Sequence, residues 1–300
     1  PKCGAPSQRE TDTFDTFFES SWYFARFTDP TNNNNGFSEK LSEYWLPVDQ
    51  YIGGIEHAVL HLLYSRFFSR ALKKWGYKIR KEPLLGLMTQ GMICHRTFKD
   101  KDNNWVNPSD VLEDKKGDFI LEKDKTPVTI GRSEKMSKSK KNVVDPEFII
   151  NTFGADTARL FMLSDSPPER DLDWTDSGVE GAWRFINRLW RIVEQNRTNL
   201  IEIGTKKPIK LNNHAEKLLK QCHKTIFDVT NDLEKFHFNK AVARIRELTN
   251  QIEKQDLSNI KDSWVKRECL ENLVKLINPI IPHLAAELWR LLGHSSMLAN

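Results

Sequence analysis

A cluster of lysines and serines between residues 131 and 142 could bind a polyanion. Lys135, Ser137, Lys138 and Ser139 lie among few apolar residues, so this stretch has little to bury and is expected to form an exposed loop. Lysine ammonium groups are mobile positive charges that suit phosphate oxygens, and serine hydroxyls can donate hydrogen bonds to the same oxygens. Most lysine-rich runs are simply solvated, so charge alone leaves open an ordinary basic loop without a ligand.

A glycine pair and two histidines form a second candidate. The pair at 53–54 follows an apolar run at 48–52 that is typical of a short buried strand, and a helical pattern at 55–72 comes next. Glycines at such a turn let a ligand approach the backbone, and the start of the helix adds partial positive charge. His57 and His61 are four residues apart, so on this helix both imidazoles would point to one side and could hydrogen-bond a substrate.

Aromatic residues near the N-terminus form a third candidate. If the chain is helical from about Asp15, then Phe17, Ser20 and Tyr23 lie three residues apart and share a face. An aromatic stripe of this kind is more often part of a protein core than the wall of a ligand pocket. The spacing alone leaves both interpretations open.

The elements around these candidates predict an α/β region. An apolar run at 84–94, interrupted by glycines, is typical of a central strand and its exit loop, where open α/β sheets bind ligands. The segment 98–130 is charged and contains short β-prone pieces, which predict a small hairpin insertion. Asp145 and Pro146 are a plausible start of a helix, and a second short helix is predicted at 155–164.

The pattern then becomes helical throughout. Apolar residues recur with helical period in five segments: 178–196, 211–233, 238–253, 258–277 and 282–292. We therefore expect an α/β domain over 1–175 and an all-α bundle over 176–300. Trp183, Trp190 and Trp289 are expected in the core of the bundle. Its basic residues are most simply solvated: Arg184, Arg188, Arg191, Lys217, Lys220, Lys224, Lys240, Arg244 and Arg246.

Composition limits the class of protein. Hydrophobic residues make up 39% of the 300 residues and charged residues 29%, which is ordinary for a globular chain. The net charge of +4 permits a polyanionic partner without requiring one. No apolar run approaches the roughly 20 residues of a membrane span, and the N-terminus lacks the apolar core of a signal peptide. These features favour a cytoplasmic protein that does not enter a membrane.

Metal binding and disulfide bonds are not expected. The four cysteines are widely scattered. Cys3 reads as the second half of a zinc knuckle, but the preceding cysteine is absent and no other cysteine has matching spacing. His57 and His61 have a spacing that zinc would use, yet they lack a third ligand. Because the chain also starts without methionine, we expect it to be a piece of something longer.

Several stretches together resemble bacterial-type leucyl-tRNA synthetases. Residues 135–139 read Lys-Met-Ser-Lys-Ser, the signature of class I aminoacyl-tRNA synthetases. More specific are Glu-Thr-Asp-Thr-Phe-Asp-Thr-Phe at 10–17, Ser-Ser-Trp-Tyr at 20–23 and Tyr-Ile-Gly-Gly-Ile-Glu-His at 51–57. Further matching stretches lie at 90–92, 154–160, 178–181 and 282–283. The resemblance covers nearly the whole chain, and it implies the C-terminal half of a Rossmann-type catalytic domain followed by a helical tRNA-binding domain.

The resemblance implies a reaction and its residues. Leucine would be activated by ATP, with Mg²⁺, to leucyl-adenylate and then transferred to tRNA(Leu), with Lys135 and Lys138 stabilising the charge of the reacting phosphates. The positions that match the family's ATP site are Gly53, Gly54, Glu56, Gln90, Gly91, Met92, Ile93, Lys135, Ser137, Lys138 and Ser139. The positions that match its leucine site are Phe17, Ser20, Tyr23, His57 and His61.

Three parts of the family pattern have no match in the chain. These are the other ATP signature, His-Ile-Gly-His or a variant of it, the large hydrolytic editing insertion, and the small domain beyond the helical bundle. Half an ATP site should not catalyse leucine activation, so the chain alone is expected to be inactive. A separate N-terminal half of the enzyme is a candidate partner. The alternative is a non-catalytic RNA-binding protein derived from a synthetase, which the intact Lys135 and Lys138 disfavour. An unrelated nucleotide-binding ATPase is a poor fit, because the chain has no Gly-x-x-x-x-Gly-Lys-Ser/Thr loop.

Overall fold

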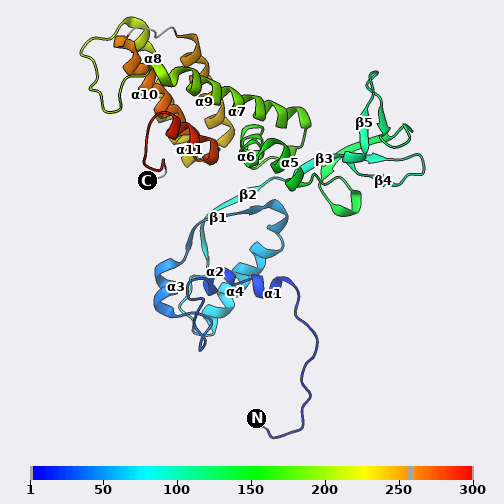
Figure 1. Ribbon diagram of the computed structural model, residues 1–300. Coiled ribbons are helices and arrows are strands. Elements are labelled where there is room, and N and C mark those ends of the chain that lie inside the picture. The colour runs from blue at the N-terminus through cyan, green and yellow to red at the C-terminus, as the bar shows by residue number, and fades with distance from the viewer. Residues whose placement is uncertain (1–2, 256–259, 299–300) are drawn as a thin grey trace. The chain divides into compact units, whose positions relative to one another are not determined.

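The computed structural model describes residues 3–255 and 260–298, and contacts group the chain into two compact units (Figure 1). The first unit extends to Gly91 and the second begins at Met92. The boundary expected at 175/176 is of a different kind, because it divides a nucleotide-binding region from a tRNA-binding region by function. It stays a prediction. No helix in the described ranges is both long and apolar enough to cross a membrane.

The first unit is built on two parallel strands. β1 (Val48–Gly54) pairs with β2 (Leu84–Gln90), so that Gly54 lies opposite Gln90. Parallel strands need a crossover connection, which here contains α4 (His61–Lys74). The remaining elements are short: α1 (Phe17–Ser20), α2 (Tyr23–Arg26), α3 (Glu39–Trp45) and the 3₁₀ helix η1 (Ile55–His57). A small buried core beside α2 and the end of α3 consists of Phe24, Ala25, Phe37, Leu46 and Ile79.

Two predictions about this unit are wrong. The helix predicted over 55–72 is instead η1, a turn and then α4, so His57 and His61 do not lie on one helix. The strand predicted to be buried at 48–52 has no buried residue, and the Ile52 side chain is 48% exposed. The physical reason is the same for both: within the described residues a two-stranded sheet covers neither its own faces nor the outer side of α4, so apolar residues there do not mark a core.

The second unit begins with a small mixed sheet. β3 (Ile93–Lys99) is central, antiparallel to β4 (Trp105–Val106) and β7 (Thr129–Lys135) and parallel to β8 (Leu172–Asp173). β5 (Val111–Glu113) and β6 (Phe119–Leu121) form a separate hairpin within 98–130. Of the strand and exit loop predicted over 84–94, the strand is β2 and the exit begins after Gln90, but Ile93 and Cys94 start a strand of the other unit.

The rest of the second unit is helical, and α8, α9 and α10 run side by side (Figure 1). The helices are α5 (Pro146–Phe153), α6 (Ala155–Ser164), α7 (Asp176–Asn196), α8 (Asn213–Glu234), α9 (Phe238–Lys254), α10 (Ile260–Ile277) and α11 (Pro282–Leu291), with a 3₁₀ turn η4 (Arg197–Asn199). The five predicted bundle helices are confirmed to within two residues. The predicted start of one of them, at 258, lies outside the described residues.

An apolar stripe on each helix forms the core of the bundle. α7 buries Val179, Ala182, Phe185, Leu189, Ile192 and Val193, and α6 adds Leu160 and Phe161 to the same cluster. The prediction of core tryptophans holds only for Trp289, which is 8% exposed. It is wrong for Trp183 and Trp190, which are 44% and 38% exposed because they flank the buried stripe of α7.

α6 is tied by hydrogen bonds to the turn between α10 and α11. The Asp156 carboxylate accepts a hydrogen bond from the backbone N–H of Leu284 at 2.7 Å and pairs with Nδ1 of His283 at 2.9 Å. The Arg159 guanidinium donates to the carbonyls of residues 279–280 at 2.8 and 3.0 Å. One short helix therefore satisfies backbone groups at the end of one bundle helix and the start of the next.

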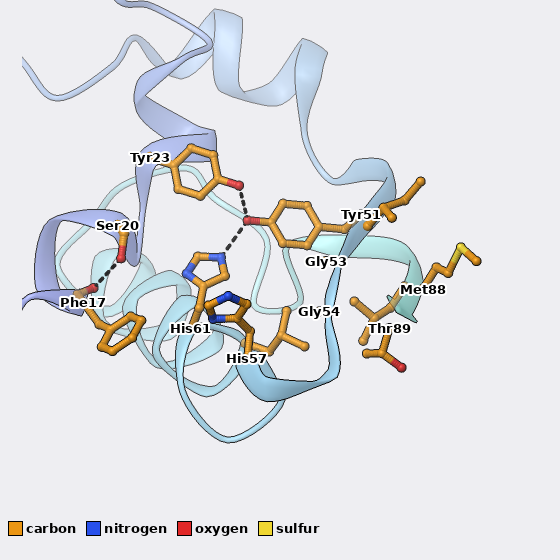
Figure 2. A pocket seen from close by; sticks show the side chains of 13 residues that line it. Phe17, Ser20, Tyr23, Tyr51, Gly53, Gly54, His57, His61, Met88 and Thr89 are labelled. Atoms are coloured by element: carbon orange, nitrogen blue, oxygen red, sulfur yellow. Dashed lines mark hydrogen bonds between the residues drawn. The ribbon is translucent and has the colours of Figure 1, made fainter. Parts of the chain in front are cut away.

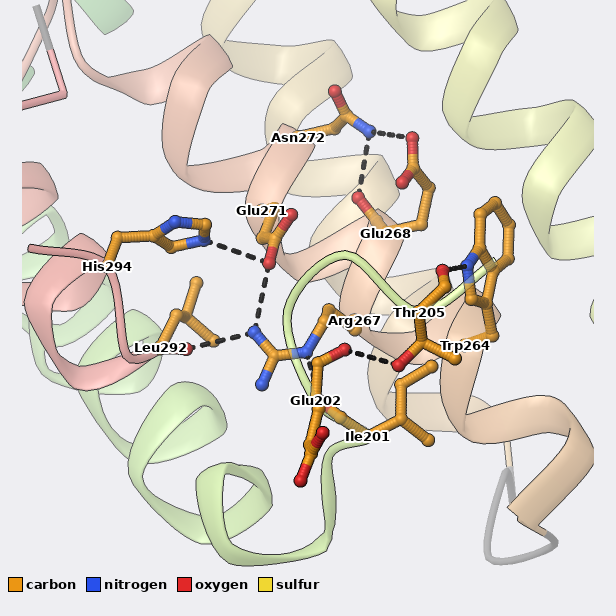
Figure 3. Close-up of polar contacts among 10 residues, drawn as sticks. All are labelled: Ile201, Glu202, Thr205, Trp264, Arg267, Glu268, Glu271, Asn272, Leu292 and His294. Atoms are coloured by element: carbon orange, nitrogen blue, oxygen red, sulfur yellow. Dashed lines mark hydrogen bonds and ion pairs between the residues drawn. The ribbon is translucent and has the colours of Figure 1, made fainter. Parts of the chain in front are cut away.

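An arginine of α10 that is mostly buried binds the segment after α7 and the end of α11 (Figure 3). The Arg267 side chain, 12% exposed, donates to the carbonyl oxygens of Ile201 at 2.6 Å and Leu292 at 2.9 Å. It also donates to the Glu271 carboxylate at 3.0 Å, and the same carboxylate oxygen pairs with Nε2 of His294. The segment after α7 and the end of α11 are thus both held by one guanidinium.

Replacing this arginine should destabilise the second unit. Arg267→Met keeps an unbranched side chain but leaves buried acceptors without a donor, so the free energy of unfolding should fall by about 2–4 kcal/mol. Urea denaturation followed by far-ultraviolet circular dichroism measures this change. The matched control is Arg290→Met, which removes an exposed arginine paired with Glu287 and should leave the midpoint unchanged. Equal shifts in the two variants would contradict a special role for Arg267.

Candidate functional site

A cavity of about 400 Å³ opens within the first unit (Figure 2). It is lined by residues of α1, α2, β1, η1, α4 and β2. All five positions predicted to line a leucine site contribute to it, together with both glycines of the turn: Phe17, Ser20, Tyr23, His57, His61, Gly53 and Gly54. The structure therefore brings together side chains that are more than 40 residues apart in the sequence.

Tyr51 is a cavity residue that sequence reasoning missed. Its hydroxyl lies 2.5 Å from the Tyr23 hydroxyl and 2.6 Å from Nε2 of His61. Tyr51 therefore links the predicted residues Tyr23 and His61 in one chain of hydrogen bonds. Burial, with a smaller contribution from Tyr23, raises the pKa of Tyr51. The only signal in the sequence was its place two residues before the glycine pair, on the strand that leads into the turn.

Two polar groups of the cavity, Tyr51 and His61, favour their neutral forms near neutral pH. Burial lowers the pKa of His61 below its usual value, and repulsion from His57 lowers it further. Nδ1 of His57 is buried and has no hydrogen-bond partner among the described residues, which leaves it available to a ligand. The opposing walls are apolar and include Phe17, Leu62 and Met88. This combination suits a small ligand that has an aliphatic part and a few hydrogen-bonding groups.

The glycine turn is shaped by Glu56. A Cβ added to Gly54 would overlap the Glu56 carboxyl group, so a larger residue there would require the Glu56 side chain to move away from the turn. A Cβ added to Gly53 would meet nothing within 4 Å, so its backbone is open to an approaching molecule. Glu56 itself does not line the cavity and packs against the turn from η1.

The predicted basic loop is half strand. β7 extends through Lys135 and pairs with β3, with Lys135 opposite Cys94, so an exposed loop over all of 131–142 is wrong. The pairing with β3 is a long-range contact, which charge composition alone does not reveal. A 3₁₀ turn, η3 (Lys138–Lys140), follows. Its lysines differ: Lys140 forms an ion pair with Glu134, whereas the described residues give the exposed Lys138 ammonium neither an ion pair nor a hydrogen bond.

Asn142 fixes the loop and was not recognised in the sequence. Its side chain is fully buried, and its amide donates to the carbonyls of His95 at 3.1 Å and Glu134 at 3.1 Å. Its Oδ1 accepts the backbone N–H of Ser137 at 2.9 Å. Lys141, immediately before it, adopts a left-handed conformation with φ of +54°, which turns the chain back toward the sheet.

The remaining predicted ATP residues are divided between the units. Gln90 ends β2, and Gly91 is the last residue of the first unit. In the second unit, the Met92 N–H donates to the Asp171 carboxylate at 2.7 Å, and Ile93 begins β3. Lys135, Ser137, Lys138 and Ser139 also belong to the second unit. Among the described residues, no group of three or more His, Cys, Asp or Glu side chains is placed to hold a metal ion.

Loss of the Asn142 side chain should loosen the loop. Asn142→Ala leaves buried carbonyls without a donor and Ser137 N–H without an acceptor, so stability should fall by about 2–4 kcal/mol. Amide hydrogen exchange at Ser137 should accelerate more than exchange in β3. Asn187→Ala is the control, because that exposed side chain donates only to the carbonyl of Trp183 in its own helix. Unchanged protection at Ser137 would refute the assignment.

Acidification should destabilise the first unit. The folded state holds the pKa of His61 below the value of about 6.5 expected for the unfolded chain. The unfolded chain therefore binds more protons below that value, so stability is retained above it and lost as pH falls. Hydrogen exchange of residues 48–90 between pH 7.5 and 5.5, corrected for intrinsic rates, measures the effect. His61→Gln should reduce the pH dependence; a wild-type stability independent of pH would show that folding does not lower the pKa of His61.

Two family models match parts of the second unit. Residues 127–175 match the model of tRNA synthetases class I (I, L, M and V), a range that includes the lysine-bearing turn. Residues 215–300 match the model of the anticodon-binding domain of tRNA ligase, which covers most of the bundle.

Curated relatives match the chain over its full length. A leucine–tRNA ligase of Paramagnetospirillum magneticum is 58% identical over 300 residues, which is 100% of this chain and 34% of that protein. One from Rhodospirillum rubrum is 55% identical, over 100% of this chain and 35% of that protein. The chain thus spans about a third of the length of the curated relatives it matches.

Solved structures agree in fold. The ternary complex of Agrobacterium radiobacter K84 LeuRS with tRNA and LeuAMS matches with a TM-score of 0.77 and 32% identity, over 100% of this chain and 34% of that one. Mycobacterium tuberculosis methionyl-tRNA synthetase bound by methionyl-adenylate matches with a TM-score of 0.59 and 17% identity, over 90% of this chain and 48% of that one, which supports the fold alone. The expected order, a mixed α/β region followed by a helical region, is confirmed. On the full-length identity and the two family matches together, the chain belongs to the class I leucyl-tRNA synthetase family.

Proposed function

We propose that this chain supplies the leucine cavity and the lysine-bearing loop of a leucine–tRNA ligase. The whole protein would use ATP to convert leucine to leucyl-adenylate and would then transfer leucine to tRNA(Leu). The observation that carries the proposal is the cavity of the first unit, which is lined by residues from both 17–23 and 53–61. The local sequence pattern of either segment alone does not predict that the two meet. The family membership supplies the reaction that such a cavity would serve.

The cavity has the chemistry that leucine needs. Each buried methylene of the aliphatic side chain contributes about 0.8 kcal/mol of binding free energy against walls such as Leu62 and Met88. The Ser20 hydroxyl donates to the carbonyl of Phe17 at 3.0 Å, so its lone pairs can accept from the leucine ammonium. Because His61 is neutral, it adds no positive charge that would repel this ammonium.

Lys138 is the lysine best suited to the reacting phosphates. Attack of the leucine carboxylate on the α-phosphorus drives negative charge onto the departing pyrophosphate, and a nearby cation lowers that barrier. The Lys138 ammonium is exposed and has no counter-ion among the described residues, whereas Glu134 already neutralises Lys140. Mg²⁺ bound to ATP would provide further charge compensation. Gly53 and Gly54, which line the cavity, would let the adenosine approach the backbone.

The uncovered faces of the sheet in the first unit are evidence for a further segment that packs on it. Parallel sheets are normally covered on both faces, yet Ile52, Leu85 and Leu87 of this two-stranded sheet are 48%, 71% and 44% exposed. We propose that the N-terminal half of the enzyme, on the same or a separate polypeptide, adds the further strands and the second half of the ATP site. The relatives are about three times as long as this chain, which leaves ample sequence for such a segment.

RNA binding without catalysis remains the second candidate. It is favoured by the match of residues 215–300 to an anticodon-binding domain and by the exposed face of α8, where Lys217, Lys220 and Lys224 follow one another at helical spacing. This face belongs to the second unit and does not depend on the leucine cavity.

Leucine-dependent exchange of pyrophosphate into ATP tests the proposal. The chain alone should give no exchange, and a mixture with the N-terminal half of a leucyl-tRNA synthetase should give exchange. In the active mixture, Lys138→Ala should lower the rate about 100-fold or more, since each 1.4 kcal/mol of lost transition-state stabilisation is a factor of ten. Lys140→Ala, at a lysine already paired with Glu134, is the matched control and should have a much smaller effect.

Three outcomes would contradict this assignment. Exchange by the chain alone would show that it holds a complete ATP site. Equal loss of exchange and of tRNA affinity in Lys138→Ala would give the loop a structural or RNA-binding role. Absence of exchange in every mixture, with tRNA binding intact, would favour the second candidate.

A further inference from the structure

A second cavity, of about 350 Å³, lies inside the helical part of the second unit between α6, α7 and α9. Gly181 is part of its wall, and a Cβ added there would meet only the Arg184 guanidinium, at 3.8 Å. Gly178 contributes to the same wall and packs directly on the ring of Phe161. The glycine-rich start of α7 therefore creates a hollow that larger side chains would fill, and the leucine cavity does not account for it.

Arg246 lines this hollow, and no carboxylate among the described residues pairs with its positive charge. Its guanidinium lies over the Phe185 ring, 4.6 Å from the centroid, which fixes its position. The described residues offer it no ion pair and no hydrogen bond. Two neighbouring arginines differ in this respect: Arg188 pairs with Glu253, and Arg244 pairs with carboxylates of α8. Burial lowers the pKa of Arg246 and repulsion from Arg188 adds to this, so the charge is held at a cost.

The same hollow contains an amide that lacks a partner. Oδ1 of Asn239 is buried without a hydrogen bond from any described residue. Buried polar atoms in folded proteins almost always have a partner, so this atom points to a missing one. A half-turn of the terminal torsion exchanges the two ends of a carboxamide, which allows Asn239 to present a donor to a bound oxygen. A cation and an amide without partners thus face one cavity.

We propose that this cavity binds a phosphate of the RNA backbone, with Arg246 as the charged donor and Asn239 as the second. A guanidinium fork matches phosphate oxygens in geometry and charge. The exposed lysines of α8, Lys217, Lys220 and Lys224, favour a polyanion over a single acidic side chain as the occupant. The proposal rests on the RNA partner proposed above and adds a site for it.

Asp165 sets the orientation of the phosphate. Its exposed carboxylate is on the cavity wall, at the end of α6, and accepts a hydrogen bond from Ser166 at 3.1 Å. Because like charges repel, the phosphate must lie on the Arg246 side of the cavity, away from Asp165. Neutralising this carboxylate should therefore strengthen binding, and removing the guanidinium should weaken it.

Binding of a tRNA(Leu) transcript to the full chain tests the proposal, with affinity measured from 50 to 300 mM salt. Arg246→Gln should weaken binding about 10-fold or more, since a hydrogen bond to a charged group contributes about 1.5–3 kcal/mol. It should also reduce the slope of log affinity against log salt by about 0.9, the value for one lost phosphate contact. Asp165→Asn should tighten binding. Arg191→Gln, which removes an exposed arginine from α7, should leave affinity within about threefold.

A second variant blocks the cavity without removing charge. Gly181→Leu improves helix propensity and should weaken RNA binding by filling the hollow, provided that circular dichroism shows a folded bundle. Equal effects of Arg246→Gln and Arg191→Gln would overturn the proposal, as would weaker binding by Asp165→Asn. If Arg246→Gln keeps full RNA affinity, the phosphate site is refuted. Absence of RNA binding by the unmodified chain would overturn the proposed tRNA partner as well.

Discussion

The attachment of α6 to the turn between α10 and α11 is the constraint on which the second unit depends. Asp156 and Arg159 satisfy backbone groups that would otherwise be orphaned at the two helix ends. Leu160 and Phe161, on the same helix, are fully buried in the bundle core. Polar and apolar contacts of one ten-residue helix thus fix it to the bundle. The lysine-bearing turn, α5 and α6 follow one another in the chain. The contacts of α6 therefore restrict where that turn can lie relative to the bundle.

The two candidate sites differ in electrostatic character. In the cavity of the first unit, Tyr51 and His61 are hydrogen-bonded to each other, and burial favours the neutral form of both. The loop of the second unit is cationic, and Asn142 holds its backbone while Lys138 stays exposed. A rigid backbone beneath a mobile charge is what stabilisation of a transient anion requires. Selection of an aliphatic substrate and handling of phosphate charge are therefore assigned to different residues.

Local pattern predicted the bundle well and the first unit poorly. The helices from α7 to α11 have long apolar stripes that bury against one another, so period alone located them. At 55–72 the apolar residues had the same period, but Ile55, Val59 and Phe67 are exposed here and no single helix forms. The family motifs identified five positions, proposed for leucine, that line one cavity, a grouping that propensity could not predict.

Residues that act across long sequence distances were missed. Tyr51 and Asn142 lie at the edges of recognised stretches, but their importance lies in partners on other segments, such as His61 or the backbone of β3. Trp183 and Trp190 were misplaced for the opposite reason: residue type suggested burial, but a one-position offset from the stripe of α7 leaves them exposed. In each case side-chain direction decided the outcome.

The uncovered sheet of the first unit also has a consequence for handling the protein. A parallel pair with exposed Ile52, Leu85 and Leu87 presents unpaired backbone groups beside apolar side chains. Such edges recruit strands from other copies and promote aggregation. Under the proposed function, production of this chain without the covering segment leaves its solubility governed by this small sheet and not by the well-packed bundle, and co-expression with that segment is the remedy.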